Sequence, residues 1–571
     1  MSRSEFTCVD LFSGCGGLTL GMQRAGFHVL AAIDCDAVAI DTLRANLIER
    51  HHPGRIPVSR ALPRDLSQFG PAELALLLDV SCVDVIVGGP PCQGFSTARQ
   101  VDGANHGARL TPDPRRDLYR HFLRYVDFFQ PRVFVLENVL GIRSASGGEY
   151  FTRVQKEARE LGLAAGHPGY RVHPQVEDAW ELGVPQKRHR QLIIGVRNDL
   201  PGYFLPDLDP APRAQRRPCL GVALGDLPIL RSGGGRDERD YDIARRTEHI
   251  LNCDDAARNY LLKVLEIERA TKLTNHVARP HSDRDLRDFA RLKEGENSKE
   301  AMRDRGVAFE FPYKKDHFKD RYTRQSRSQP CSTIVAHLSK DGLMFIHPTQ
   351  TRSLTPREAA RVQSFPDWFR FPASRTHAFR LIGNAVPPLV AEAVGLAVKD
   401  FLREAQALGA KCDESCREHS GTHRTVRCSA DRNTRTACIP GSPKEAEHSL
   451  EWLIHMSRRA LSTLPVEDFL RGWHATLYLL PGLHPDSTLD HGHVIETVPA
   501  GQLALSSVEE LLSRRYARSG WPVALELIGR EAWRRYEVGE ITEKEFYCVE
   551  AQRAGLGRKN PGTASTRRRI S

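Results

Sequence analysis

The alternation of short apolar runs with amphipathic stretches between Thr7 and about Val196 constrains the fold of this chain more than any other feature. The runs FTCVDLF, VDVIVGG, RVFVLENV and RQLIIGV have the length and composition of buried strands, and each ends in Gly, Pro or polar residues. Amphipathic segments of helical length separate them, which is typical of strand-helix-strand units. The sequence therefore predicts an α/β fold with a parallel sheet, at whose carboxyl edge ligands bind.

The alternation breaks twice, and these breaks divide the chain into regions. From about Asn198 to Pro330, Pro, Gly and mixed charges replace it, which predicts an inserted domain. The apolar patterning typical of strands or helices resumes at CSTIVAHL. The following stretch SLTPREAARVQSF predicts a helix with Ser353 or Thr355 at its cap and Pro356 at its first position. We expect one domain built from residues 1–197 and 331–402, and the insert from residues 198–330.

The residues after Leu402 have a different composition. Segment 403–447 contains six possible zinc ligands, whose spacing fits no standard zinc module: Cys412, Cys416, His419, His423, Cys428 and Cys438. We therefore predict a linker there and no metal site. Apolar residues return beyond His448, and stretches such as ALELIGREAW favour a small, mostly helical accessory region over residues 448–571.

Charge and cysteine usage narrow the setting in which the chain works. The 571 residues carry a formal net charge of +10 with a pI near 9.0, which suits a polyanionic partner such as nucleic acid. Thirteen scattered cysteines favour reduced thiols over a disulfide framework. The sequence shows neither a signal peptide nor an uncharged apolar run of membrane-spanning length, so we expect a cytoplasmic protein without a membrane anchor.

A glycine-rich turn follows the first predicted strand, in the stretch DLFSGCGGLTLGMQRAGF. Gly14, Gly16 and Gly17 allow the backbone to approach a ligand closely, although a plain tight turn is the alternative. Two carboxylates follow the next strands: Asp34 is placed to hold ribose hydroxyls, and Asp65 to accept from an adenine amino group. The alternative for both is an ordinary turn residue at a strand end.

The stretch VIVGGPPCQGFS places Cys92 on a turn between two prolines and Gln-Gly. Pro90 and Pro91 restrict the backbone and aim the side chain, and Gly94 leaves the following loop free to move. A buried structural cysteine is the usual alternative, but it fits poorly with a thiol bracketed by turn residues. The pattern favours a nucleophile.

Five motifs occur in order along the chain: DLFSGCGG, GGPPCQGFS, LENV, QKRHR and IGNAVPP. Together they resemble those of the cytosine-5 DNA methyltransferases, over roughly residues 6–400, and the likeness is greatest to the bacterial enzymes. The resemblance implies a Rossmann-like catalytic domain with an inserted target-recognition domain and a C-terminal extension. It also implies transfer of a methyl group from S-adenosylmethionine to carbon 5 of a cytosine flipped out of double-stranded DNA.

The resemblance assigns four catalytic residues. Cys92 would add to carbon 6 of the cytosine and make carbon 5 nucleophilic. Glu137 would be the acid at the ring nitrogen, since it follows three apolar residues and partial desolvation favours its protonated form. Arg190 would contact the cytosine carbonyl oxygen, and Arg188 would support Glu137 or a phosphate.

The cofactor pocket implied by the resemblance gathers residues from the whole catalytic region. Its predicted members are Phe12, Ser13, Gly14, Gly16, Gly17, Leu18, Asp34, Asp65, Leu66, Pro90, Leu118, Asn384 and Ala385. Two positions depart from the family, which usually has glutamate where this chain has Asp34 and a bulky apolar residue where it has Cys35. These departures bear on cofactor affinity rather than on the type of reaction.

The insert would then be the domain that reads the DNA sequence. Its densest basic run comprises Lys314, Lys315, Lys319, Arg321, Arg324 and Arg327, for which a solvated charged face is the alternative. We expect a monomer that protects DNA in a restriction-modification system beside a cognate endonuclease. Three alternatives stay open: a tRNA methyltransferase of the same fold, a catalytically silent DNA-binding protein, and an unrelated α/β thiol enzyme.

Overall fold

The computed structural model describes residues 6–50, 52, 55–91, 118–202, 204, 208–214, 217–311, 322–340, 342–372, 374–419, 473–479, 493–498 and 523–529. The chain forms two compact units, Met1–Ala407 and Leu408–Ser571, which we describe separately.

A seven-stranded sheet with the order β3-β2-β1-β4-β5-β7-β6 organises the first unit. Its strands are β1 (Thr7–Leu11), β2 (His28–Asp34), β3 (Arg60–Pro63), β4 (Val85–Gly88), β5 (Val133–Val139), β6 (Tyr170–Asp178) and β7 (His189–Arg197). The strands predicted from FTCVDLF, VDVIVGG, RVFVLENV and RQLIIGV are β1, β4, β5 and β7. The predicted α/β fold is confirmed.

The prediction of a wholly parallel sheet is wrong at one strand. β7 runs antiparallel to both of its neighbours, β5 and β6. No helix separates β6 from β7 in the chain, and a parallel pair needs a long crossover connection. The short connection after Asp178 therefore forces β7 to return in the opposite direction.

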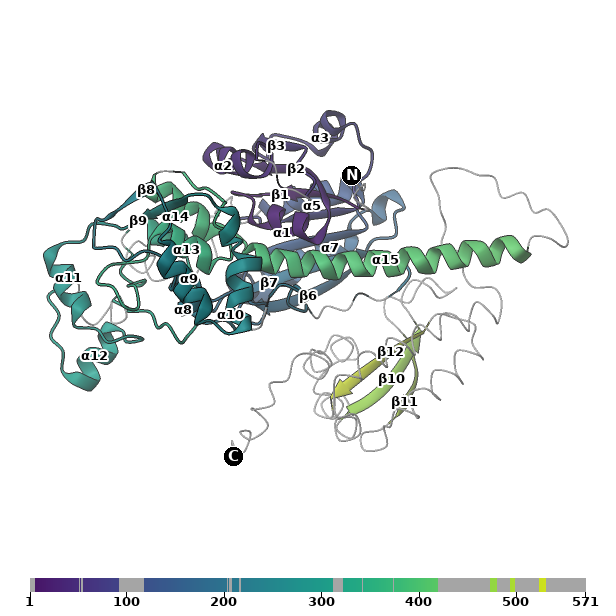
Figure 1. The fold of residues 1–571 in the computed structure, drawn as a ribbon. Coiled ribbons are helices and arrows are strands. Elements are labelled where there is room, and N and C mark those ends of the chain that lie inside the picture. Colours follow the sequence, from purple (N-terminus) through teal and green to yellow (C-terminus); the bar gives the residue numbers. More distant parts are fainter. Residues whose placement is uncertain are drawn as a thin grey trace. The chain divides into compact units, whose positions relative to one another are not determined.

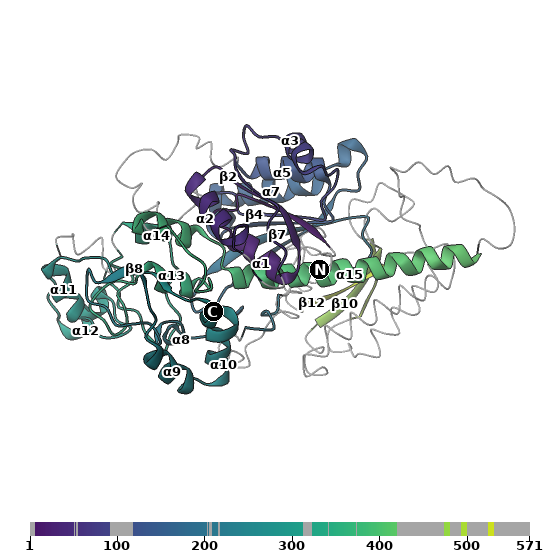
Figure 2. The same ribbon diagram turned by 45° about the horizontal axis from the view of Figure 1, so that its top comes forward.

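Helices cover both faces of this sheet, as Figures 1 and 2 show. On one face, α1 (Gly17–Ala25), α2 (Ala37–Leu47) and α15 (Pro388–His419) pack with alternate strand residues such as Val133 and Val135. On the other, α3 (Pro71–Leu78), α5 (Leu118–Phe129) and α7 (Glu149–Glu160) pack on the residues between them, such as Phe134 and Leu136. The period of two in each strand thus supplies two separate cores.

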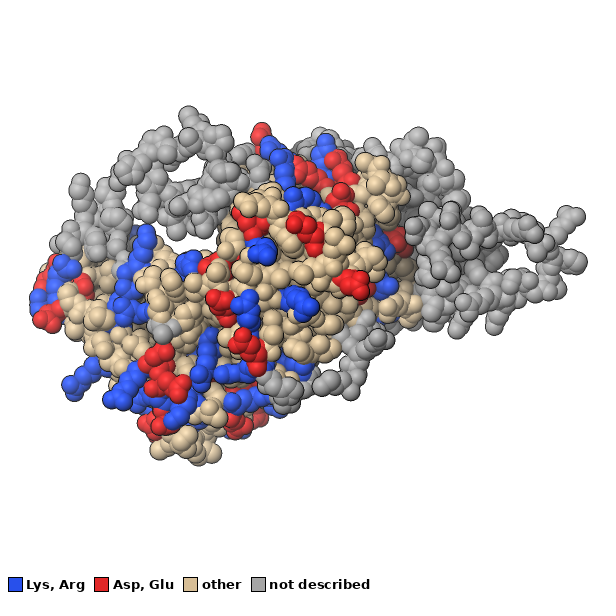
Figure 3. All heavy atoms as spheres, turned by 90° about the horizontal axis from the view of Figure 1, so that it is seen from above, with Lys and Arg blue, Asp and Glu red and all other residues tan. Residues whose placement is uncertain are grey.

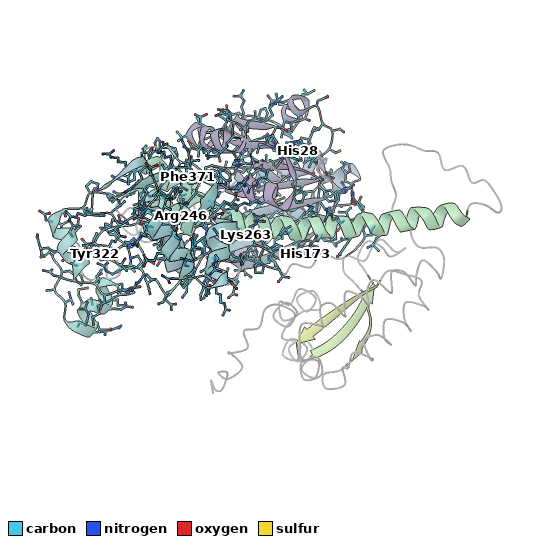
Figure 4. The ribbon with its side chains drawn as sticks, viewed as in Figure 1. His28, His173, Arg246, Lys263, Tyr322 and Phe371 are labelled. Atoms are coloured by element: carbon cyan, nitrogen blue, oxygen red, sulfur yellow. The ribbon has the colours of Figure 1, made fainter. Side chains whose placement is uncertain are left out.

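The first part of the region after β7, from α8 to β9, has no separate hydrophobic core. It contains α8 (Leu220–Leu224), β8 (Gly235–Arg239), α9 (Ile243–Leu251), α10 (Asp255–Asn259), the π-helical turn η5 (Tyr260–Val264) and β9 (Leu273–Val277). Residues of α8, α9, η5 and β9 share a hydrophobic core with α13 (Pro356–Val362). Arg361 of α13, fully buried, pairs with Asp226 and Asp367 and so ties the two segments together. Figure 4 labels Arg246 and Phe371 in this body.

A second hydrophobic cluster builds a smaller lobe from described residues of 283–311, 322–340 and 342–346. It contains α11 (Asp283–Ala290) and α12 (Ser298–Arg305), and it includes Phe289, Tyr322 and Ile346. Figure 4 shows Tyr322 in this lobe, away from Arg246 and Phe371. The expected boundary at Pro330 therefore does not coincide with a boundary in the structure, since the lobe takes in residues on both sides of it.

Two helices after α13 return the chain to the sheet. The predicted cap of α13 is confirmed, because the Thr355 hydroxyl accepts from the Glu358 amide and the Glu358 carboxylate accepts from the Thr355 amide. α14 (Arg375–Asn384) follows, and α15 continues to His419, so residues 403–419 are helical rather than linker. The stretch Arg375–Leu408 has the length and composition of a membrane span, which the sequence analysis did not anticipate, but 83% of its apolar window is buried inside the protein.

Beyond the end of α15, the described part of the second unit is an antiparallel sheet with the order β11-β10-β12. Its strands are β10 (Trp473–Leu479), β11 (His493–Val498) and β12 (Val523–Gly529). The prediction of a helix in ALELIGREAW is wrong over Ala524–Gly529, where every residue is paired with β10. The apolar residues Val523, Leu525 and Leu527 alternate there, which is the period of a strand.

Candidate functional site

The carboxyl ends of β1, β2, β4 and β5 meet at one edge of the sheet, and most of the predicted site residues lie there. Leu11, the last residue of β1, is in register with Ile33 of β2 on one side and with Gly88 of β4 on the other. The Ser13 amide then donates to the Ile33 carbonyl at 3.0 Å, which holds the glycine-rich turn over the end of β2. The predicted ligand-binding edge is thus assembled from segments far apart in the chain.

The glycine-rich turn uses the left-handed region of backbone space several times. Phe12, Gly14 and Gly16 have φ angles of 58°, 54° and 93°. A Cβ atom at Gly14 would meet no atom within 4 Å, so the backbone there borders open space. At Gly17 the opposite holds, because a Cβ atom would lie 2.2 Å from the Val386 carbonyl oxygen. The turn therefore leaves space on one side and packs tightly against residues 384–387 on the other.

Two buried oxygens beside this turn lack a hydrogen-bond partner among the described residues. The Ser13 hydroxyl is buried and makes no hydrogen bond, and Oδ1 of Asp10 is in the same condition. The other Asp10 oxygen accepts from Thr19, and burial raises the pKa of Asp10 to about 7. Unsatisfied buried polar atoms are costly, so the Ser13 hydroxyl indicates a place where a ligand would complete the bonding.

Asp34 lies at the end of β2 with its carboxylate turned to the glycine-rich turn. It accepts from the Gly14 amide at 2.9 Å and from the Asp36 amide at 2.9 Å. Burial raises its pKa. The sequence analysis missed its neighbour Asp36, which caps α2 and pairs with Arg380 of α14 at 2.7 Å. Arg380 stands four residues before Asn384 in FRLIGNAVPP, and its charge was the signal that could have linked these segments.

Asp65 and Leu66 follow β3, the strand next to β2. Asp65 is exposed and accepts from the Ser67 amide at 2.8 Å, and this hydrogen bond lowers its pKa. The Leu66 side chain is buried in the core, while its carbonyl accepts from Arg124 of α5. Leu118, the first residue of α5, is half-buried. β3 pairs with β2, so Asp65 and Leu66 follow the strand next to the one that ends at Asp34.

Glu137 and Arg190 lie at the end of β5 and the start of β7, beside the end of β4. The two residues lie on the adjacent strands β5 and β7, and Arg190 Nε is 2.8 Å from Glu137 Oε1. Both side chains are largely buried, with exposed fractions of 14% for Arg190 and 12% for Glu137. An ion pair in such surroundings is screened less than one on the surface. Glu137 is therefore paired with Arg190, whereas the sequence analysis had given the support of Glu137 to Arg188.

The end of β4 brings the start of the cysteine loop to Glu137. A Cβ atom at Gly89 would lie 3.1 Å from Glu137 Oε2, and the Asn138 side chain donates to the Pro90 carbonyl at 3.3 Å. The Asn138 side-chain oxygen also accepts from the Val139 amide at 2.9 Å, so this side chain holds the local backbone through two hydrogen bonds. Cys92 itself lies outside the described residues, as do Lys314, Lys315, Lys319 and Arg321.

Arg188 does not lie where the sequence analysis expected it. It is buried, and it donates to the carbonyl oxygens of Ile334, Gly383 and Ala385 at 2.8, 3.3 and 3.0 Å. The guanidinium is thus used in fixing the backbone before Val386, and it has no access to a DNA phosphate. Arg188 was predicted to support Glu137 or a phosphate. In the structure its hydrogen bonds go to backbone carbonyls, and the ion-pair partner of Glu137 is Arg190.

Asn384 and Ala385 end α14 directly beside the glycine-rich turn. Ala385 is buried and Asn384 is exposed.

In the smaller lobe, Arg324 is also buried and donates to the carbonyls of His347 and Phe289, so its predicted part in a DNA-facing basic run is wrong. Arg327 is largely exposed and pairs with Glu294.

The fold and the site define an α/β protein with an open glycine-rich turn over the ends of β1 and β2 and a Glu-Arg pair beside the start of a cysteine loop. A family model described as C-5 cytosine-specific DNA methylase matches residues 6–400. The type II methyltransferase M.DdeI of Desulfomicrobium norvegicum is 34% identical over 402 residues, which cover 68% of this chain and 86% of that protein. The type II methyltransferase M1.HphI of Haemophilus parahaemolyticus is 31% identical over 397 residues, covering 69% and 87%.

A solved structure shows the same likeness. It is a DNA modification methyltransferase encoded within an E. coli prophage, with a TM-score of 0.52 and 27% identity, covering 70% of this chain and all of that one. This chain belongs to the C-5 cytosine-specific DNA methylases. It is therefore a DNA (cytosine-5)-methyltransferase, and its methyl donor is S-adenosylmethionine.

The residues at the sheet edge fit this donor. Open space at Gly14, the unpartnered Ser13 hydroxyl and the carboxylate of Asp34 together offer a backbone cradle, a hydrogen-bonding hydroxyl and an acceptor for hydroxyl groups. Asp65, Leu66 and Leu118 lie along the edge from Asp34. Phe12 and Pro90, at the ends of neighbouring strands, are half-buried and buried.

Proposed function

We propose that Cys92 and Glu137 carry out the reaction, that Arg190 holds the cytosine with Glu137, and that the thirteen predicted pocket residues bind the methyl donor. The observation that carries this proposal is the placement of Gly89 and Pro90 against Glu137 and Asn138. The chain enters the cysteine loop at this point, only two residues before Cys92.

The chemistry assigned to each residue follows from the low reactivity of cytosine toward a methyl donor. Its carbon 5 is a weak nucleophile, so the Cys92 thiolate forms a bond to carbon 6 and turns the ring into an enamine. Glu137 supplies a proton or a strong hydrogen bond at the ring nitrogen, which absorbs the excess electron density. Arg190 orients Glu137 through their ion pair and can donate to the cytosine carbonyl oxygen. S-adenosylmethionine supplies the methyl group as the electrophile.

We also propose that residues 198–346 read a double-stranded DNA sequence. Figure 3 shows many Lys and Arg side chains, interspersed with Asp and Glu, on the left of the molecule, where Figure 1 places α11 and α12. Such cations can contact a phosphate backbone. The similar proteins are type II methyltransferases, which supports a role as the protecting enzyme of a restriction-modification system, with a cognate endonuclease acting on the same sequence. We expect the enzyme to act as a monomer in the cytoplasm.

A duplex with 5-fluorocytosine at the target site tests the assignment of Cys92. After methyl transfer, the carbon 5 substituent must leave as a cation before the thiol can be eliminated, and fluorine cannot do so. The full chain should therefore form a DNA adduct that needs S-adenosylmethionine and survives denaturing electrophoresis. Cys92→Ser should form none, whereas Cys82→Ser, which removes an exposed thiol, should form it normally.

An adduct that persists in Cys92→Ser and maps to another cysteine would refute the assignment and leave the activity standing. The same assay on a tRNA substrate separates the alternative of an RNA enzyme. Trapping on tRNA but on no DNA duplex would refute the proposal that residues 198–346 read DNA.

A further inference from the structure

A pocket of about 370 Å³ lies at the opposite end of the strands from the site. α2 begins after the carboxyl end of β2 and runs back along it, so Arg50 and His52, which follow α2, stand near the strand starts. Arg269 and Lys272, before β9, and Trp368 and Arg370, after α13, complete the wall. The pocket therefore lies between the end of α2 and two later segments, residues 269–272 and 367–370.

Hydrogen bonds and ring contacts hold these walls in place. The buried Asn46 side chain donates to the Arg370 carbonyl and accepts from the Arg370 amide, both at 2.8 Å. Arg50 donates to the Trp368 carbonyl, and the His52 ring lies over Trp368 with a centroid distance of 3.9 Å. The cations are thus presented by a fixed backbone rather than by a loose surface loop.

The acidic groups around the pocket are already engaged by other cations. Asp367, which also lines it, pairs with buried Arg361 and accepts from Tyr241. Glu266 pairs with Arg24, Arg55 and Arg269 together. At the rim, Asp240 pairs with Lys272 at 2.6 Å and Glu238 with Arg370 at 3.4 Å.

Arg50 differs from the other cations of the pocket. Arg269, Lys272 and Arg370 each pair with an acidic group, whereas Arg50 forms no such ion pair among the described residues. Partial burial lowers its pKa, and the positive charges of Arg370 and Arg357 lower it further. Like charges gathered around a half-buried guanidinium destabilise one another, and a bound anion would relieve that repulsion. The pocket is a cationic site whose charge is incompletely neutralised by the protein.

We propose that this pocket binds a phosphate group through Arg50, Lys272 and Arg370. Guanidinium groups match the oxygens of a phosphate with paired hydrogen bonds, and the lysine adds a point charge. The phosphate can come from a free phosphorylated compound or from DNA backbone that continues beyond the target site. In either case the same phosphate would contact side chains from three segments: the residues after α2, residues 269–272 and residues 367–370.

Calorimetric titration of the full chain with pyrophosphate tests the proposal for a free ligand. Arg50→Gln and Arg370→Gln should each weaken binding by about 10-fold to 100-fold, as expected for lost charged hydrogen bonds. Arg44→Gln is the matched control, because Arg44 is a half-exposed arginine of α2 that pairs with Asp41 outside the pocket. Thermal unfolding checks that each variant is folded, and Lys272→Gln serves if Arg50→Gln is not.

DNA binding provides the second arm. With a duplex that extends well beyond the recognition site, Arg370→Gln should lower the affinity and reduce the salt dependence by about one released counterion. With a short duplex, the variant should match the unmodified chain. Loss of pyrophosphate binding supports a free ligand, and loss confined to the long duplex supports the DNA backbone. If neither ligand distinguishes the pocket variants from Arg44→Gln, the proposal is overturned.

Discussion

Gly17→Ala should weaken binding of S-adenosylmethionine, because the glycine is the point where α1 meets residues 384–387. The new Cβ would lie 2.2 Å from the Val386 carbonyl oxygen, a backbone atom that cannot rotate away. The two segments would have to separate by roughly 1 Å, and overpacking of this kind costs about 1–3 kcal/mol. Alanine gains at most ~1 kcal/mol over glycine in a helix. Subtracting this gain in full leaves a net loss of roughly 0–2 kcal/mol, centred on about 1 kcal/mol, which corresponds to about 5-fold and at most about 30-fold in affinity.

Calorimetric titration with S-adenosylmethionine and urea unfolding measure the two consequences separately. Gly70→Ala is the matched control, since Gly70 has a φ of −96° and its added Cβ would meet only the end of the Glu73 side chain at 3.3 Å. It should leave the cofactor affinity unchanged, and because Gly70 is the N-cap of α3, alanine there should cost at most about 1 kcal/mol of stability. If Gly17→Ala binds the cofactor as tightly as the unmodified chain and is equally stable, the close packing of Gly17 on Val386 is refuted.

Three further changes test other parts of the molecule. Glu137→Gln keeps the shape but supplies no carboxylic proton, so single-turnover methylation should slow by ~10²-fold to 10⁴-fold with cofactor affinity nearly unchanged; normal turnover would contradict the acid role. Asp10 has a pKa of about 7 in the fold, above its usual value, so the folded chain binds an extra proton and loses stability as the pH rises from about 4 to 7. Asp10→Asn should flatten this part of the pH profile in urea unfolding, whereas an unchanged slope would exclude Asp10 as its source. A chain ending at Ala407 should fold and methylate DNA, because residues 1–407 form one compact unit; loss of cofactor binding would show that the C-terminal unit completes the site.

Local features of the fold could be predicted because their physical causes are local. The strands from VDVIVGG and RVFVLENV follow from short apolar runs with defined ends, and the α13 cap follows from Thr355, Pro356 and Glu358 within four residues. The direction of β7 depends instead on whether a crossover helix precedes it. The strand β12 was mistaken for a helix because a short apolar run fits either period.

Contacts between distant segments could not be predicted, because one residue type serves several purposes. Arg188 and Arg190 stand two residues apart in QKRHR and both looked suited to anions. β7 begins at His189, and Arg190 lies opposite Val139 at the end of β5, near Glu137. Arg188 precedes that strand and is buried among the carbonyls of Ile334, Gly383 and Ala385. Only the packing of residues almost 200 positions away decides between these two roles.

Asp34 shows how the departure from the family's glutamate can be accommodated. A carboxylate has about four lone-pair sites, and the amides of Gly14 and Asp36 use two of them. The remaining sites can still accept from ribose hydroxyls, so holding the turn and binding the cofactor are compatible. The shorter side chain keeps the carboxylate close to the end of β2, where both amides can reach it. Asp34 therefore shapes the glycine-rich turn, and the same carboxylate keeps free lone pairs for the ribose contact that we propose.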